Sequence, residues 1–367
     1  MTRPPGRKQA SLFGKLMLSF GVLAVGLLLL EGAARIRLLV KFGRTDNEFY
    51  RSEMHPEARF RVPVPDQQIG SLRINSHGFR GEEIEDPKPE GRIRIAFLGA
   101  STTFCAEVSA SDRTWPARLI ARLAERFEPV EFDQVNGGIP GIGADESLRN
   151  LRHRIAPLSP DVVVIYHATN DLSRDTRKLA EQQGLFTVAG DERSFLARIS
   201  VGWDLIEKNL KVMARKRAAS AGEDRLQYDA EQLAAEFHDV LTRLVEEARG
   251  VSRLVVLVTF STRLRAEQTP EEQLAASNTS LLYMPYMTVQ GLLDGFAAYN
   301  RTIRDVAAET GAVLVADENS IPSDAAHFRD SVHLTDQGCE LMAERLFEVL
   351  QQEPRFLNLV AEHSRAR

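Results

Sequence analysis

Short apolar runs rich in valine alternate along most of this chain with longer stretches that have a helical pattern. Residues 162–166 and 254–259 lack charged side chains, as do strands that are buried on both faces of a sheet. Three further strand candidates lie at 92–98, 130–135 and 312–316. Because parallel strands need crossover helices between them, this alternation predicts an α/β fold in which helices cover both faces of a five-stranded parallel sheet.

The predicted helices between these strands lie at 115–127, 145–155, 230–248, 290–310 and 335–350. Residues 172–229 fit the alternation badly, and we interpret them as an inserted helical segment. This segment contains a run of basic residues: Lys208, Lys211, Arg215, Lys216 and Arg217. The run is either a solvated helix face, or part of a lid or of a surface that faces a membrane.

Charge is distributed unevenly along the 367 residues. Residues 1–44 contain eight Lys or Arg and one Glu, whereas the whole chain has a net charge of -5. The remainder is therefore strongly acidic, which argues against nucleic acid as the main partner. The two cysteines, Cys105 and Cys339, exclude a disulfide framework and a multi-cysteine zinc site. A packed core must hold the acidic body together.

The N-terminal part contains an apolar segment that is long enough to cross a bilayer. Residues 16–30 carry no charge, and extension to 13–34 reaches the ~20 residues that a membrane-spanning helix needs. The alternatives are a cleaved signal peptide and a buried amphipathic helix. The sequence Glu-Gly-Ala-Ala-Arg that follows the run matches a signal-peptidase site poorly. We therefore predict a short basic leader at 1–12 and a transmembrane anchor at 13–34.

Four basic residues precede this span and four follow it, so the positive-inside rule does not decide its orientation. A single N-terminal anchor with a short basic leader usually leaves its body outside the cytoplasm, and we expect a periplasmic or extracellular body. Residues 35–91 are expected to form a polar irregular segment and linker. The α/β domain then spans 92–351, and residues 352–367 form a C-terminal tail.

Ligands of an open parallel sheet bind beyond the carboxyl ends of its strands, so the residues that follow each strand are the candidates for chemistry. Ser101 follows the first strand at a predicted strand-to-helix turn, where free helix amides favour a developing negative charge. It is a candidate nucleophile, although serine is also an ordinary helix cap. The glycine-rich run 136–141 follows the second strand, and it marks either a close backbone approach to a ligand or a turn.

Two more candidates follow later strands. Asn170 lies after the third strand, either as an amide donor or as a helix cap. Asp330 and His333 lie three residues apart on the last loop. At this spacing the carboxylate can orient the ring and leave its other nitrogen free as a base. The joint placement of these residues at successive strand ends predicts one active site.

These blocks resemble the SGNH (GDSL-type) hydrolase family over about residues 92–350. Gly99-Ala100-Ser101 stands where the family has its Gly-Asp-Ser nucleophile block, and 136–141 resemble its second block. Residues 168–171, Ala-Thr-Asn-Asp, resemble the Gly-x-Asn-Asp block, and 330–333 match the Asp-x-x-His block. Residues 74–81 and the leading anchor are similar to those of a bacterial membrane-tethered branch of the family.

The resemblance implies a flavodoxin-like three-layer α/β/α sandwich and acyl transfer through a covalent serine ester. It makes Ser101 the nucleophile, His333 the general base and Asp330 the residue that orients His333. The backbone amides of Ser101 and Gly141 and the side chain of Asn170 would form the oxyanion hole. The implied reaction needs no metal and no other cofactor.

The implied substrate is a small-molecule or glycan ester. An O-acyltransferase or a deacetylase of envelope glycans would use the same groups, and a non-catalytic SGNH-like binding domain is the alternative from another class. Ala100 replaces the aspartate of the family's first block and Ala168 replaces the glycine of its third. These replacements can alter loop geometry or substrate choice.

The other candidates have simpler interpretations. His167 is expected to line or support the pocket, and no chelating pattern accompanies it or His327. Cys105 is expected to be a small core residue. Asp171 is interpreted as a helix-start residue rather than as a second acid.

Overall fold

The computed structural model of the chain describes residues 12–42, 50–185, 194–220 and 225–365. The chain divides into two compact units. The smaller unit comprises residues 1–49 and 188–214, and the larger comprises residues 50–187 and 215–367. Almost all of the predicted basic leader at 1–12 lies outside the described residues.

The larger unit is built on a five-stranded parallel sheet with the strand order β6-β5-β7-β8-β9. Its strands are β5 (Arg92–Gly99), β6 (Glu131–Asn136), β7 (Val162–Tyr166), β8 (Leu254–Val258) and β9 (Val313–Val315). In chain order this is the arrangement 2-1-3-4-5, which confirms the predicted flavodoxin-like topology. Every residue of β7 and β8 is buried, as expected for central strands that are covered on both faces.

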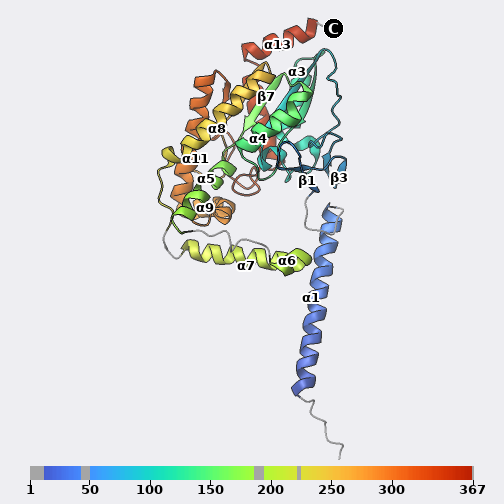
Figure 1. The fold of residues 1–367 in the computed structure, drawn as a ribbon, viewed down its shortest axis with the longest axis vertical. Helices are drawn as coiled ribbons and strands as arrows, with labels where there is room; N and C mark the ends of the chain where they lie inside the picture. Colours follow the sequence, from blue (N-terminus) through green and yellow to red (C-terminus); the bar gives the residue numbers. More distant parts are fainter. Residues whose placement is uncertain (1–11, 43–49, 186–193, 221–224, 366–367) are drawn as a thin grey trace, which may run out of the picture. The chain divides into compact units, whose positions relative to one another are not determined.

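Helices pack against this sheet in two layers (Figure 1). The helices of the larger unit are α2 (Ser101–Phe104), α3 (Trp115–Arg126), α4 (Ala144–Asn150), α5 (Thr169–Gln182), α8 (Ala230–Val251), α9 (Pro270–Ala276), α10 (Asn278–Tyr283), α11 (Val289–Thr310), α12 (Asp336–Leu350) and α13 (Pro354–Arg365), with shorter helical turns η1 (Ser111–Arg113), η2 (Leu151–Ile155) and η3 (Ala156–Leu158). In one layer α8 contacts α4, α5 and α11, and in the other α3 contacts α12. The result is the predicted three-layer sandwich.

The centre of the core fixes the ends of β5 and β7, where the candidate site lies. Trp115 packs edge-on against Phe97 of β5 and Tyr166 of β7, with ring centroids 5.1 and 6.0 Å apart. Arg94 of β5 is fully buried as well, and its guanidinium pairs with the Asp133 carboxylate at 2.7 Å. The pairing makes burial of this charge tolerable.

The segment predicted as a polar irregular linker, 35–91, differs from that expectation. Residues 50–91 belong to the larger unit and contain two antiparallel strand pairs. They are β1 (Ser52–Met54) with β2 (Arg61–Pro63), and β3 (Gln67–Ile69) with β4 (Leu72–Ile74). Arg80 forms bridges to Ile74 and to Asn136 of β6, and Phe79 lies in the core. Strands of three residues are too short to show an alternating pattern, so the sequence does not reveal them.

The predicted C-terminal tail, 352–367, also differs, because it contains α13. Phe356 of this helix is fully buried and packs against Phe127 and Phe132, with ring centroids 5.9 and 6.3 Å apart. Leu359 and Val360 are buried on the same side of the helix. The folded body therefore extends to this last helix.

The insertion that was predicted at 172–229 covers fewer residues than expected. Leu172 and Thr176 of α5 are buried in the larger unit, so the helix belongs to the body. Residues 188–214 belong to the smaller unit instead. The run of basic residues in this segment lies outside the described side chains: Lys208, Lys211, Arg215, Lys216 and Arg217.

The smaller unit contains α1 (Leu12–Phe42), α6 (Phe195–Ile199) and most of α7 (Val201–Ser220). Within α1, Gly14–Arg37 is long and apolar enough to cross a membrane, with a mean hydropathy of 2.1, and it is exposed. A signal sequence near an N-terminus would satisfy the same criteria.

Candidate active site

Ser101 begins α2 directly after β5 ends at Gly99. A Cβ atom at residue 99 would lie 2.0 Å from Thr103 Oγ1 and 2.8 Å from the carbonyl oxygen of Tyr166, so this turn requires glycine. The chain leaves the sheet sharply at this point. The turn places the half-buried Ser101 at the carboxyl edge of the sheet, next to the ends of β6 and β7.

The Ser101 hydroxyl lies at one end of a hydrogen-bonded chain of three side chains. His333 Nε2 lies 2.9 Å from Ser101 Oγ, and His333 Nδ1 lies 2.8 Å from Asp330 Oδ2. Asp330 Oδ1 accepts hydrogen bonds from the backbone N–H groups of Val332 and His333, each at 3.0 Å. The carboxylate is thus fixed by its own loop, and it orients the imidazole so that Nε2 faces Ser101.

Burial opposes the charge of both Asp330 and His333, but their mutual contact outweighs it. Burial raises the pKa of Asp330, whereas the His333 contact and two backbone amides lower it, and the net pKa is lowered. Burial lowers the pKa of His333, whereas the hydrogen bond to Asp330 and the negative charge of Glu107 raise it, and the net pKa is raised. The imidazole is therefore a stronger base than an ordinary histidine.

Gly141 and Asn170 approach the same place from two other strand ends. Gly141 has a φ of +87°, a backbone conformation that other residues rarely adopt. Asn170 lies in the first turn of α5, and its Nδ2 donates a hydrogen bond to the carbonyl oxygen of Ile142 at 2.8 Å. This bond ties Asn170 to the loop that carries Gly141.

Ser101, Gly141, Asn170 and His333 all line one cavity of about 480 Å³. The other residues of its wall are Pro140, Thr169, Ser173, Arg174, Arg177, Thr279, Ser280, Tyr283, Met284 and Val332. The volume is in the range of small-molecule sites. A serine hydroxyl, a hydrogen-bonded imidazole and amide donors around one cavity are the groups that acyl transfer requires.

The GDSL-like lipase/acylhydrolase family matches residues 97–341, about two thirds of the chain. The chain belongs to this family. It is therefore an ester-hydrolysing enzyme, and the match includes every residue predicted for the site.

Solved structures that resemble the chain include two enzymes at low sequence identity. An acetylxylan esterase from Geobacillus stearothermophilus is 16% identical with a TM-score of 0.45, and the match covers 71% of this chain and 95% of the esterase. A lipase/acylhydrolase from Enterococcus faecalis is 15% identical with a TM-score of 0.41, and the match covers 70% and 94% of the two chains. Comparison with curated proteins found no significant match.

Two arginines that were not predicted as site residues also line the cavity of this GDSL-like enzyme. Arg174 and Arg177 lie on α5, beyond Asn170. Neither residue directly follows a strand, so the rule that ligands bind beyond the strand ends does not point to them. Helical spacing is the signal that could have found them, because residues four and seven positions after Asn170 lie on its face of the helix.

His167 and Asp171 do not line the cavity but support it from behind. His167 Nε2 lies 2.7 Å from Ser147 Oγ, and Asp171 Oδ1 accepts a hydrogen bond from the backbone N–H of Ala144 at 2.8 Å. Burial lowers the pKa of His167 to about 3 and raises the pKa of Asp171 to about 7. These bonds join the segment between β7 and α5, and the first turn of α5, to α4. They support the helix that carries Asn170 and the start of α4, which follows the loop of Gly141.

The remaining candidates lie apart from this chemistry. His327 Nδ1 is hydrogen-bonded to Asp324 at 2.7 Å. Cys105 and Cys339 are buried free thiols whose sulfur atoms lie 3.8 Å apart. Within the described part of the chain, no group of three or more His, Cys, Asp or Glu side chains is arranged to hold a metal ion.

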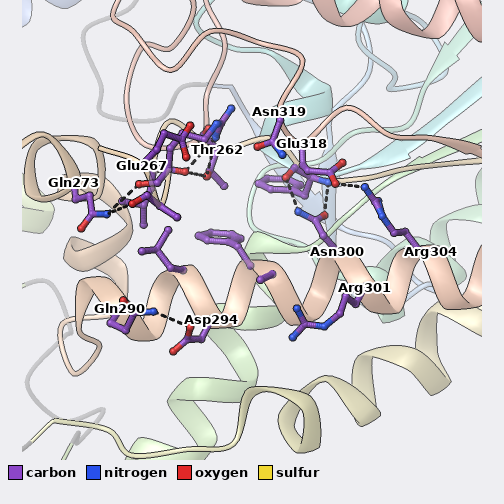
Figure 2. A pocket seen from close by; sticks show the side chains of 17 residues that line it. Thr262, Glu267, Gln273, Gln290, Asp294, Asn300, Arg301, Arg304, Glu318 and Asn319 are labelled. Atoms are coloured by element: carbon purple, nitrogen blue, oxygen red, sulfur yellow. Dashed lines mark hydrogen bonds and ion pairs between the residues drawn. The ribbon is translucent and has the colours of Figure 1, made fainter. Parts of the chain in front are cut away.

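A second cavity, of about 530 Å³, lies between α11 and the loops that follow β8 and β9 (Figure 2). Its polar side chains bond to their own neighbours. Arg304 pairs with Glu318, and the Asn300 amide both accepts from the backbone N–H of Phe260 and donates to its carbonyl oxygen. The described residues that line this cavity include none of the predicted site residues. The candidate active site is therefore the cavity at Ser101.

Proposed function

We propose that this protein is a membrane-anchored serine hydrolase that cleaves small-molecule or glycan esters through an acyl-serine intermediate. The observation that carries the proposal is the hydrogen-bonded chain from Ser101 through His333 to Asp330, with contacts of 2.9 and 2.8 Å, at the wall of the cavity. A serine hydroxyl is a weak nucleophile, and a base within hydrogen-bond distance activates it. A domain that only binds a ligand has no need of this arrangement.

In the first half of the reaction, His333 Nε2 removes the Ser101 proton while Oγ attacks the ester carbonyl carbon. Asp330 stays ionised and stabilises the imidazolium that forms. The tetrahedral intermediate collapses when His333 gives this proton to the leaving alkoxide, which departs as an alcohol. In the second half, His333 takes a proton from water while the water oxygen attacks the acyl-serine. The second tetrahedral intermediate collapses when His333 returns this proton to Ser101 Oγ, which releases the acid and restores the free enzyme.

The negative charge of each tetrahedral intermediate would be stabilised by the backbone N–H groups of Ser101 and Gly141 and by the Asn170 side chain. The Asn170 amide has two N–H groups, and the bond to Ile142 occupies one of them. In the proposed mechanism that bond also positions the other N–H for the substrate oxygen. Donors that are fixed before the reaction need no reorganisation when the charge develops.

The two alanines that depart from the family blocks are compatible with this mechanism. Ala168 has a φ of -175°, which lies outside the left-handed region that favours glycine, so its φ does not require glycine. Ala100 is buried between β5 and α2, where its methyl group offers no side-chain cap to α2. Neither side chain takes part in proton transfer, so we expect effects on substrate choice rather than loss of the reaction.

We also propose that α1 remains as an uncleaved anchor and that the body lies outside the cytoplasm. Glu31 of α1 accepts hydrogen bonds from Ser200 Oγ at 2.7 Å and from the backbone N–H of Gly202 at 2.8 Å. Cleavage near Ala34 would remove Glu31 and leave the first N–H groups of α7 without this partner. These contacts support retention of α1 in the mature protein.

Labelling with a fluorophosphonate tests the nucleophile directly, because the reagent forms a covalent bond only with an activated serine. We expect the full-length protein to be labelled, and both Ser101→Ala and His333→Ala to lose the label. Ser320→Ala, which removes an exposed serine outside the cavity, should be labelled like the wild type. Absence of label on the wild-type protein, or its persistence on Ser101→Ala, would refute the proposal.

A further inference from the structure

One face of α5 continues the cavity wall beyond the proposed oxyanion hole. Asn170, Arg174 and Arg177 all line the cavity, and their spacing of four and three residues places them on the same side of the helix. A rise of about 1.5 Å per residue puts Arg174 about 6 Å and Arg177 about 10 Å along the helix axis from Asn170. Both guanidinium groups are thus within reach of a substrate that is bound at Ser101.

The cavity wall is positively charged. Among the described residues that line it there are two arginines and no Asp or Glu. Arg174 Nη2 pairs with Glu146 Oε2 at 2.7 Å, and this carboxylate oxygen also accepts the backbone N–H of Gly143 at 3.0 Å. Glu146 itself does not line the cavity. The pair therefore holds the half-buried Arg174 side chain beside the cavity without placing a carboxylate in its wall.

The rest of the wall has no charged side chain except His333. Tyr283, Met284 and Val332 supply apolar surface, which suits an acyl chain or the face of a sugar ring. A guanidinium binds an anion more strongly than it binds the hydroxyl or carbonyl oxygens of a neutral ester. The planar fork of N–H donors on arginine matches the oxygen atoms of a carboxylate or a phosphate.

We infer that the natural substrate is an anionic ester, whose carboxylate or phosphate group binds Arg174 and Arg177 while its ester carbonyl lies between Ser101 and Asn170. The inference rests on the proposed hydrolase function. An ester of an acidic saccharide and an ester of a phosphorylated alcohol share this chemistry, and the experiment has a separate arm for each.

The test measures kcat/KM of the full-length protein in detergent for three acetyl esters: one of a neutral sugar, one of a uronic acid and one of a sugar phosphate. We expect one or both anionic esters to be preferred about 10- to 100-fold, the range of a charge-assisted contact. Arg177→Gln should lose most of this preference through a higher KM, with kcat unchanged, because the anion is bound equally in the ground and transition states.

Lys178→Gln is the matched control, since it makes the same change of charge at the next residue of α5, an exposed position outside the cavity. It should keep the preference of the wild type. Equal rates on neutral and anionic esters, or an equal loss in Lys178→Gln, would overturn the anion site and leave the hydrolase proposal standing. Absence of hydrolysis of all three esters, together with absence of fluorophosphonate labelling, would instead refute the hydrolase proposal.

A second, independent observation concerns the smaller unit. There, α6 and the described part of α7 expose large apolar side chains. They are Phe195, Leu196, Ile199, Trp203, Leu205, Leu210 and Met213. On α7, Trp203, Ile206, Leu210 and Met213 recur every three or four residues and therefore form one stripe. We call this set of four residues the α7 stripe. Asp204 and Leu205 lie outside this stripe, and Glu207, four residues after Trp203, borders it.

The beginning of α7 is bonded to α1 where the apolar run of α1 ends. Glu31 directly follows Leu30, and its carboxylate accepts from Ser200 Oγ and from the backbone N–H groups of Val201 and Gly202, at 2.7, 3.3 and 2.8 Å. A Cβ atom at Gly202 would lie 3.6 Å from Leu30 Cγ, so the two helices are in close contact there. In a bilayer spanned by α1, the start of α7 would therefore lie at the depth where the apolar run of α1 ends.

We propose that α6 and the α7 stripe lie in the boundary between head groups and acyl chains of the bilayer that α1 spans. The bilayer is the occupant because α7 begins in contact with α1 at the end of its apolar run, and α1 is itself long enough to span a bilayer. A tryptophan in the stripe fits this depth, since its ring is apolar and its N–H is polar.

Trp203 supplies the readout, because the other tryptophan of the chain, Trp115, is fully buried in the core. The full-length protein is reconstituted in phosphatidylcholine vesicles that carry bromine at a shallow or at a deep position of the acyl chain. We expect shallow bromine to quench the emission more than deep bromine. Trp203→Phe should remove this quenching and leave only the emission of Trp115.

Quenching of Trp203 by aqueous iodide and not by brominated lipid would place the stripe in water. Protection from both quenchers would mean that protein covers it, either the larger unit or a second copy of the chain. Either result would overturn the proposal for α6 and α7.

Discussion

His333 faces two carboxylates, and each raises the pKa of its imidazole in a different way. Asp330 accepts the hydrogen bond of Nδ1–H, whereas Glu107 acts through its charge. A general base must be neutral, so kcat/KM falls when the pH drops below the pKa of His333 in the free enzyme. Because this pKa is raised, the acidic limb of the pH profile should lie above the ordinary value of 6.5.

Glu107→Gln tests the contribution of the charge, because it removes the carboxylate without touching the hydrogen bond to Asp330. The pKa of His333 should fall, so the neutral imidazole should persist to lower pH and the acidic limb of kcat/KM should shift to lower pH. The measurement is the pH profile of kcat/KM on a neutral ester. Glu125→Gln, an exposed carboxylate of α3, should leave the limb in place. A shift to higher pH in Glu107→Gln would contradict the assignment of His333 as the base.

At the scale of single elements, the central strands and the long helices were predictable because their patterns are long. The predicted 162–166 strand is β7 as observed, and the predicted 290–310 helix differs from α11 by one residue. Continuous apolar runs arise from burial on both faces, and this requirement acts on every residue of such a strand. The strands of three residues before β5 pair with strands that are close to them in sequence, but each is too short to show a comparable pattern.

The residues of the candidate site also fall into those that the sequence predicts and those that it does not. Ser101, Gly141, Asn170, Asp330 and His333 follow strands or lie on the last loop, so topology and motif spacing point to them together. Arg174 and Arg177 reach the cavity from one and two turns further along α5. That side of the helix is known only once the packing of α5 is known. The support from His167 and Asp171 likewise depends on how these residues contact α4.

The helix α13 was not predicted: the sequence suggested a tail where the structure has a packed helix. Its packing can be tested by mutation. Phe356→Ala should destabilise the protein by about 3–5 kcal/mol, the cost of removing a large buried aromatic side chain. Leu357→Ala changes the next residue, which is exposed, and should alter stability by at most about 0.5 kcal/mol. Urea unfolding of the two variants measures the difference. Equal, small effects would show that α13 does not pack on the body.

At the scale of the whole molecule, the question is whether the hydrolase remains attached to a membrane. If α1 is an uncleaved anchor, the full-length protein should fractionate with membranes and resist extraction by carbonate. A reporter that works only outside the cytoplasm should be active when it is fused after Arg367. A soluble protein that begins near Ala34 would show that α1 is a cleaved signal sequence, and activity of a cytoplasmic reporter would reverse the proposed orientation.

The whole molecule also brings Ser101 and His333 together from positions 232 residues apart in the sequence. Groups that act as one unit have strongly non-additive effects, because loss of either one abolishes the step that both perform. The turnover of a neutral acetyl ester by the purified wild type, Ser101→Ala, His333→Ala and the double variant tests this directly. The mechanism predicts that each single variant loses roughly 10⁴- to 10⁶-fold in kcat, and that the double variant loses about as much as either. Full activity of Ser101→Ala, or losses in the two single variants that multiply in the double variant, would contradict it.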